Sequence, residues 1–119
     1  MSTNELGIVY ERPWGTYETL KYAECTQVKI ITVNPGGILS LQKHFKRSEH
    51  WVVIKGKPSI TLGTETKEYK VGDHVFIPIE EIHRIANYTD KPTQIIEVQL
   101  GEYLGEDDIV RLEDAYKRY

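Results

Sequence analysis

Turn-forming residues divide almost the whole of this chain into short β-prone segments, and this punctuation limits the folds that it can adopt. Each segment is rich in β-branched or aromatic residues and ends near a cluster of Gly, Pro, Asn or Asp. Repeated short strands at such spacing predict an all-β sandwich or barrel. The strands we expect span residues 8–10, 15–20, 27–33, 38–44, 49–55, 59–62, 65–69, 74–77, 83–87 and 93–100. In residues 106–119, the helical spacing of Ile109, Leu112 and Tyr116 predicts a short helix or an irregular packing arm.

Composition is consistent with one domain and argues against several classes of partner. A chain of 119 residues with 39% hydrophobic content can bury one sandwich core, so we expect a single domain over residues 1–119. The net charge of −3 argues against a nucleic-acid-binding protein, which normally shows a basic surplus. No apolar run is long enough to cross a bilayer, and the first residues lack the pattern of a signal peptide. Because the single Cys25 also rules out an intrachain disulfide, we expect a cytoplasmic protein with no membrane or nucleic-acid partner.

Side chains of the types that bind metals recur between residues 36 and 87, in two groups with ordered spacing. The first group is Gly36-x5-Gln42-x-His44-x4-Glu49-x6-Gly56, and the second is Gly72-x5-Pro78-x4-His83-x3-Asn87. Glycine accepts a positive φ and proline fixes a turn or strand boundary, so these residues suit the tight turns of a hairpin scaffold. Any one of the side chains His44, Glu49 and His83, taken alone, is more often a surface or hydrogen-bonded residue than a metal ligand. The ligand-type and turn residues together, at these spacings, indicate a metal-binding site.

Strand alternation brings the candidate ligands together. Gln42 and His44 lie two residues apart in an expected strand, so their side chains point to the same face of the sheet. Glu49 begins the next expected strand after a polar turn, and His83 follows a second hairpin. We therefore predict one divalent metal ion held by two imidazoles and two oxygen ligands. This ligand set suits zinc first, with manganese, iron, cobalt and nickel as alternatives.

The two groups resemble the paired motifs of the cupin superfamily, whose fold is a jelly-roll β-barrel of two antiparallel sheets. Two positions depart from the usual cupin pattern. Gln42 stands where the first histidine is usual, and Glu80 stands where the second motif usually has glycine.

A narrower resemblance covers residues 12–116. The segments Arg12-Pro-Trp-Gly15, Ile96-Glu-Val-Gln99 and Tyr103-Leu-Gly-Glu-Asp-Asp-Ile-Val-Arg111, among others, are similar to the C-terminal cupin domain of type II mannose-6-phosphate isomerases. In that group Gln-x-His is the normal ligand pair. The domain is often fused behind a mannose-1-phosphate guanylyltransferase domain in bifunctional enzymes. This sequence has no glycine-rich nucleotide loop, so the resemblance implies the isomerase activity and not the guanylyltransferase activity.

The narrower resemblance implies a metal-dependent aldose-ketose isomerase that interconverts mannose 6-phosphate and fructose 6-phosphate. Such a reaction removes a proton next to the sugar carbonyl and returns it to the neighbouring carbon, while a metal ion stabilises charge on the oxygens. The resemblance also implies that Ile95, Glu97 and Gln99 point inward, although alternation alone favours exposure of the two polar side chains. Glu97 is the candidate general base, with Glu80 and Lys29 as alternatives.

A phosphate group requires cationic partners, and the predicted substrate is a small-molecule sugar phosphate. The candidates are Arg47 on the turn before Glu49, then Arg84 beside His83, then Arg12, because a guanidinium group offers planar donors that match phosphate oxygens. Alternation turns Arg84 away from His83, which counts against it. Gln99 is a further candidate for substrate contact.

Two other functions stay open from the sequence. One is a non-catalytic cupin module that binds a sugar or a metal. The other is a different metal-dependent cupin enzyme, such as an oxygenase or another sugar isomerase or epimerase.

We also expect a homodimer, because the edge strands of a small sandwich need protection. The segment Ile8-Val-Tyr10 and three tyrosines near the end of the chain, Tyr103, Tyr116 and Tyr119, supply apolar surface that a monomer can leave exposed.

Overall fold

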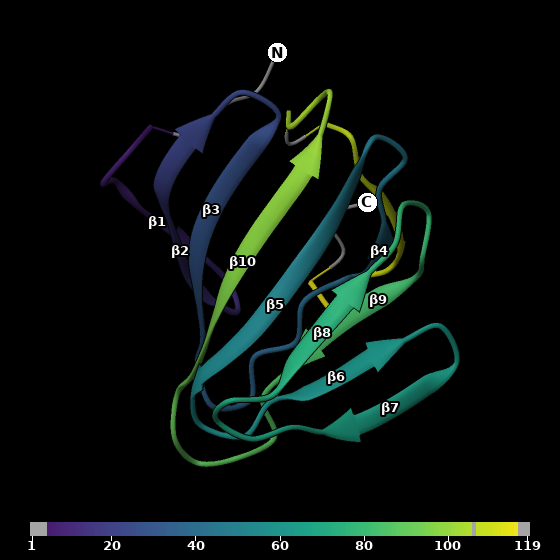
Figure 1. Ribbon diagram of the computed structural model, residues 1–119. Helices are drawn as coiled ribbons and strands as arrows, with labels where there is room; N and C mark the ends of the chain where they lie inside the picture. The colour runs from purple at the N-terminus through teal and green to yellow at the C-terminus, as the bar shows by residue number, and fades with distance from the viewer. Residues whose placement is uncertain (1–4, 106, 117–119) are drawn as a thin grey trace.

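The computed structural model describes residues 5–105 and 107–116, which fold into two antiparallel β-sheets (Figure 1). These residues contain no helix, and therefore none that is long and apolar enough to span a membrane. The described strands are β1 (Val9–Arg12), β2 (Gly15–Ala23), β3 (Thr26–Val33), β4 (Leu41–Lys43), β5 (Arg47–Lys55), β6 (Ser59–Leu62), β7 (Glu65–Glu68), β8 (His74–Ile77), β9 (His83–Ala86), β10 (Thr93–Gly101) and β11 (Val110–Glu113). The all-β architecture expected from the sequence is confirmed.

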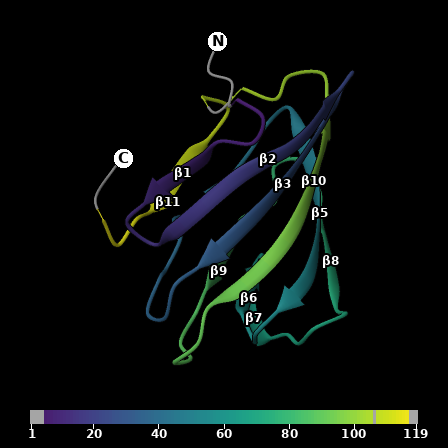
Figure 2. The same ribbon diagram turned by 90° about the vertical axis from the view of Figure 1, so that its left-hand side faces the viewer.

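Strands distant in the sequence are neighbours in both sheets. The larger sheet has the order β1-β2-β3-β10-β5-β8, and the smaller has the order β11-β4-β9-β6-β7. In Figure 1 the long strands β2, β3, β10 and β5 run side by side, and in Figure 2 the same four strands are seen after a quarter turn. The shorter strands β6, β7 and β9 belong to the other sheet, and β6 and β7 lie at the lower right in Figure 1. This order places β5 and β10, which carry several candidate site residues, next to each other and away from the edges of the larger sheet.

Alternation along the strands sets the inner face, as the sequence predicts. In β5 the side chains of Glu49, Trp51 and Val53 are buried, whereas the residues between them are exposed. The buried apolar side chains of the two sheets form one core cluster, which comprises Trp14, Tyr17, Ile31, Val33, Leu39, Trp51, Val53, Ile60, Val75, Ile77, Ile85 and Ile95. The polar site residues are therefore inward-facing members of strands that this core holds in place.

One expected strand is shorter than predicted. Only Leu41–Lys43 of residues 38–44 form a strand, and Ile38 makes an isolated bridge to Ala86. Nearby backbone groups bond to β9 and the loop that follows it, including a 3.0 Å hydrogen bond from Leu39 N to Ile85 O. The segment before β4 thus follows β9 without forming a continuous ladder, and His44 lies just beyond the end of β4.

The tail is a strand and not the short helix that its spacing allows. Val110 and Arg111 pair with Lys43 and Gln42, so β11 hydrogen-bonds along the edge of β4. This pairing gives hydrogen-bond partners to backbone groups at the otherwise open edge of β4. That gain favours a strand over the helix that the spacing of the apolar residues allows. Tyr116 packs against the core, as the alternative of a packing arm predicts. Residues 106 and 117–119 lie outside the described part of the chain.

Glu80 occupies a backbone conformation that favours glycine. The N–H of Glu81 donates to the carbonyl of Pro78 at 3.1 Å, which closes a four-residue turn, and Glu80 at its third position has a φ of 68°. A type II turn requires a positive φ at this position and usually has glycine there. The departure from the cupin pattern noted in the sequence therefore places an L-residue in a strained conformation.

Candidate metal centre

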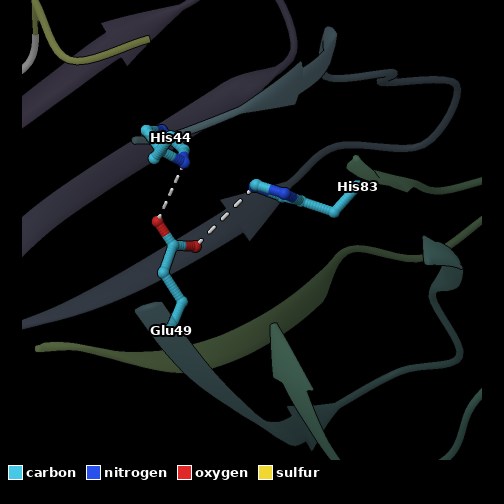
Figure 3. Close-up of side chains that lie close together, drawn as sticks. All are labelled: His44, Glu49 and His83. Carbon is cyan, nitrogen blue, oxygen red and sulfur yellow. Dashed lines mark ion pairs between the residues drawn. The ribbon is translucent and has the colours of Figure 1, made fainter. Parts of the chain in front are cut away.

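Three of the four predicted ligands converge inside the protein. His44 follows β4, Glu49 lies in β5, and His83 begins β9. Each is almost fully buried, and one potential ligand atom from each lies within 4.8 Å of the others. Figure 3 shows the two imidazole rings directed at the carboxylate of Glu49 from different sides. The measured separations are 3.6 Å from His44 Nδ1 to Glu49 Oε2 and 3.9 Å from His83 Nε2 to Glu49 Oε1.

A hydrogen bond to the backbone fixes which ring nitrogen of His83 carries a proton. Its Nδ1 lies 2.9 Å from the carbonyl oxygen of Glu81, and a carbonyl only accepts, so Nδ1 carries the proton. In the neutral ring the other nitrogen, Nε2, then has a lone pair; it is buried and has no hydrogen-bond partner among the described residues. An orphaned imidazole nitrogen beside a carboxylate fits a divalent metal ion, because neutral imidazole is a common metal ligand.

Glu49 is held as a carboxylate by donors on both oxygens. Oε1 accepts a 2.9 Å hydrogen bond from Trp51 Nε1, and Oε2 accepts a 2.8 Å hydrogen bond from Arg47 Nε. Burial alone raises the pKa of Glu49, but the positive charge of Arg47 and a hydrogen bond from Glu97 hold that pKa well below its usual value. Burial, followed by the negative charge of Glu49, raises the pKa of Glu97 well above its usual value. Of these two adjacent carboxyl groups, Glu49 is the ionised one.

Gln42 lies beside this group in a less buried position. It is the register partner of His83 across β4 and β9, and it lines the same cavity as His44. Its Oε1 accepts a 2.8 Å hydrogen bond from Ser40 Oγ. The amide is thus next to the His44, Glu49 and His83 group, and its role as a fourth ligand stays a prediction.

A cavity of about 200 Å³ opens next to the candidate metal centre. Strands of both sheets contribute to its wall. Its charged lining residues are Arg12, Lys29, Arg47, Glu97 and Arg111, and its other lining residues are Trp14, Tyr17, Ile31, Leu39, Ser40, Gln42, His44, Trp51 and Ile109. The surplus of cationic over acidic side chains in this wall favours an anionic ligand.

The inward orientation of the polar residues of β10 is confirmed. Ile95, Glu97 and Gln99 are all buried. Glu97 lines the cavity and is the register partner of both Lys29 and Trp51. Gln99 does not line the cavity and accepts a 2.8 Å hydrogen bond from Gln27 Nε2. Of the two predicted polar residues, only Glu97 therefore faces the space where a substrate would lie.

The three predicted phosphate-binding arginines lie in different environments. Arg47 is not on an exposed turn but is the first residue of β5 and is buried. Arg12 lies at the surface, lines the cavity and donates a 3.0 Å hydrogen bond to the hydroxyl of Tyr17. Arg84 points away from the cavity, as alternation predicts, and binds Leu39 O and the Glu113 carboxylate. It joins β9 to the C-terminal strand.

Asp108 holds the turn before Arg47 in place. Its carboxylate accepts hydrogen bonds from the backbone N–H groups of Phe45 and Lys46, at 3.1 and 3.0 Å. The turn between His44 and Arg47 is thereby anchored to the C-terminal segment. The same segment was part of the resemblance noted in the sequence, and the structure gives it a positioning role.

Two cationic residues of the cavity wall are not among the phosphate-binding candidates predicted from the sequence. Arg111 is not predicted because its segment is expected to be helical or irregular, whereas in β11 it pairs with Gln42 and lines the cavity. Lys29 is predicted from the sequence only as an alternative base. It is a buried lysine on the inner face of β3, with its Nζ 4.5 Å from the ring centre of Tyr17. A lysine on the apolar face of an alternating strand is the signal that could have identified it.

Comparison with solved structures shows the fold. The oxalate decarboxylase of Lactobacillus farciminis matches with a TM-score of 0.76 and 23% sequence identity, covering 88% of this chain and 33% of that chain. A likeness at this identity concerns the fold alone, which is the expected cupin jelly roll of two antiparallel sheets.

Comparison with protein families and curated sequences is more specific. The alginate biosynthesis protein AlgA of Pseudomonas aeruginosa is 50% identical over 107 residues, which cover 90% of this chain and 22% of AlgA. The mannose-1-phosphate guanylyltransferase ManC of Salmonella typhimurium is 45% identical over 107 residues, which also cover 90% of this chain and 22% of that protein. The chain therefore spans about a fifth of the length of these relatives. Because the family model "Mannose-6-phosphate isomerase C-terminal" matches residues 3–114, this chain belongs to that family.

Proposed function

We propose that this domain is a metal-dependent isomerase that interconverts mannose 6-phosphate and fructose 6-phosphate. The observation that carries the proposal is the buried group of His44, Glu49 and His83 beside a cavity with a cationic wall. Membership of the mannose-6-phosphate isomerase C-terminal family supports the choice of substrate. A cytoplasmic location is part of the same proposal.

The donor set fits one divalent metal ion. His44, Glu49 and His83 would hold it, with Gln42 as the proposed fourth ligand, and zinc is the first choice among first-row metals. When bound, the ion would supply Lewis-acid stabilisation of negative charge on the sugar oxygens.

Glu97 is the proposed carrier of the proton between the two carbons. Its carboxyl group lines the cavity and hydrogen-bonds to Glu49, so it lies between the candidate metal centre and the space available to a sugar. A side chain in that position can reach a substrate that also contacts the metal ligands. Lys29, opposite Glu97 in β3, would orient the carboxyl group and supply a compensating positive charge.

The cationic wall is the proposed binding site for the phosphate group. Arg12, Arg47 and Arg111 line the cavity and belong to three different strands, β1, β5 and β11. Guanidinium groups that converge from separate strands can bind several phosphate oxygens at once. Arg84 and Gln99 do not line the cavity, so the proposal assigns them no contact with the phosphate.

A turnover assay tests the proposal. Purified protein should be stripped with a chelator, dialysed, reloaded with one metal at a time, and supplied with mannose 6-phosphate or a related sugar phosphate. We expect fructose 6-phosphate only after reloading, and little product from the other sugar phosphates. The variant Glu97→Gln should bind metal normally and form much less product. If metal-loaded wild-type protein does not convert mannose 6-phosphate, a non-catalytic binding module becomes the better account.

Arg47 provides a test of phosphate recognition at saturating metal. A hydrogen bond to a charged group contributes roughly 1.5 to 3 kcal/mol, so Arg47→Ala should weaken mannose 6-phosphate binding about tenfold or more. Binding of unphosphorylated mannose should change little, because it lacks the phosphate. Equal losses for both sugars would mean that Arg47 positions the ligand residues and does not contact the phosphate.

A further inference from the structure

Arg47 is bound to two of the three candidate metal ligands. Its Nε donates to Glu49 Oε2 at 2.8 Å, and its Nη2 lies 2.9 Å from His44 Nε2. The guanidinium group is buried, so these contacts are made away from bulk water. A positively charged side chain therefore occupies part of the ligand shell that the proposed metal ion needs.

The contact with His44 uses the only lone pair of that ring. A guanidinium group has donors and no acceptor, so His44 Nε2 must be the acceptor. A neutral imidazole has one lone pair, and its proton then lies on Nδ1, the nitrogen that faces Glu49 at 3.6 Å. His44 thus differs from His83, whose lone pair is directed at Glu49 and has no hydrogen-bond partner among the described residues.

Arg47 must leave His44 whichever ring nitrogen binds the metal. If Nε2 binds, the lone pair that accepts the Arg47 hydrogen bond is used by the ion. If Nδ1 binds, the proton moves to Nε2 and two donors face each other at the 2.9 Å separation. Repulsion between the guanidinium group and a divalent cation acts in the same direction.

We propose that Arg47 is an internal competitor of the metal ion, and that metal binding releases it toward a phosphate in the cavity. Arg12, Lys29 and Arg111 already line that cavity, so a released guanidinium group enters a cationic region and is stabilised there by an anion. Coupling between two sites is reciprocal, so metal and sugar phosphate each strengthen the binding of the other. The inference rests on the metal site of the proposed function and not on isomerase turnover.

Metal affinity measured without substrate tests the competition. The variant Arg47→Met keeps a long side chain but has no donors, and Arg84→Met is the matched control, since Arg84 also pairs with a glutamate but outside the cavity. Zinc dissociation constants would be obtained by competition with a chromophoric chelator. We expect Arg47→Met to bind zinc about tenfold more tightly than wild type, within the range usual for coupled sites, and Arg84→Met to match wild type. Equal or weaker zinc binding by folded Arg47→Met would overturn the proposal.

A crystal structure of zinc-loaded wild-type protein gives a second test that does not depend on the folding of a variant. We expect the Arg47 guanidinium group to lie beyond hydrogen-bonding distance of both ring nitrogens of His44. Retention of the present 2.9 Å contact in a zinc-loaded site would overturn the proposal.

The coupling to phosphate is measured with sorbitol 6-phosphate, a reduced sugar phosphate that cannot isomerise. Calorimetry would give its affinity for the metal-free and zinc-loaded forms of wild type and Arg47→Met. Zinc should increase the affinity for sorbitol 6-phosphate, and the ratio of the zinc-loaded to the metal-free affinity should be about tenfold larger in wild type than in Arg47→Met. Equal ratios would contradict the release of Arg47 to the phosphate. If zinc competition is found without turnover of mannose 6-phosphate, the isomerase proposal fails and this inference stands.

Discussion

At the residue scale, the two histidines of the candidate centre differ in their readiness to bind a metal. His83 has its proton fixed on Nδ1 by Glu81 O, whereas His44 is engaged by Arg47. We expect His83→Ala to abolish zinc binding in the chelator competition while the β-sheet circular dichroism spectrum is retained, because the core cluster does not include the ligands. His74→Ala, which changes an exposed histidine of β8, is the control and should bind zinc as wild type does. Undiminished zinc binding by His83→Ala would remove His83 from the site.

Glu80 is a second residue with a measurable local effect. An L-residue in the left-handed region costs roughly 1 to 2 kcal/mol, and glycine removes this cost but adds chain entropy to the unfolded state. Glu80→Gly should therefore increase the free energy of unfolding by up to about 1 kcal/mol in urea denaturation. Glu81→Gly, at the next residue of the same turn, has no positive φ to relieve and should be destabilising. A lower free energy of unfolding for Glu80→Gly would show that the backbone of Glu80 is not strained.

The sequence is sufficient to predict that His44, Glu49 and His83 lie close together, because ligand type and strand alternation both constrain them. It could not predict the environment of Arg47, because the four residues between His44 and Glu49 look like a polar turn. The fold instead begins β5 at Arg47 and buries its side chain. Hydrogen bonds to Glu49 and His44 offset the cost of burying that charge, and no local sequence pattern reports such partners.

At the element scale, the C-terminal segment is part of the site architecture. β11 covers the edge of β4, and Asp108 just before it binds the turn that leads to Arg47. Most of the strands could be predicted, since their boundaries are marked by turn residues. β11 could not, because its apolar residues also fit a helix and its pairing with β4 is a contact between distant segments.

Asp108 allows this anchoring to be tested. Asp108→Asn places an amide N–H₂ group near backbone donors and removes the charge, so it should lower the free energy of unfolding by roughly 1.5 to 3 kcal/mol. Asp107→Asn is the matched control at an exposed neighbour, and we expect a much smaller change. Urea denaturation of the three proteins gives the comparison. If the two variants are equally stable, the turn does not depend on Asp108.

At the scale of the whole molecule, an apolar surface on the larger sheet supports the predicted homodimer. Val52, Ile54 and Phe76 are 38%, 39% and 49% exposed on the neighbouring strands β5 and β8, and β8 is the last strand of its sheet. The tyrosine surface that motivated the prediction is reduced, since Tyr116 packs on the core and Tyr119 lies outside the described residues. We expect the second copy to cover these apolar side chains and the open edge beside them.

Light scattering coupled to size exclusion measures the predicted dimer directly. Wild-type protein should have the mass of two chains at micromolar concentration, and Phe76→Lys should have the mass of one. Val71→Lys alters an apolar residue that is 60% exposed outside the strands, and should leave the dimer intact. A monomeric wild type would show that the surface has another role.

We propose that one metal ion is held inside the barrel by residues from β5, β9 and the segment just after β4. Anomalous diffraction from crystals of zinc-loaded protein, recorded on both sides of the zinc edge, would locate the ion and its ligands. We expect one strong zinc peak, with donor atoms of His44, Glu49 and His83 within about 2.0 to 2.4 Å, and with Gln42 as the fourth protein ligand. A zinc peak that none of these side chains contacts, or two of the four ligands on opposite faces of a sheet, would contradict it.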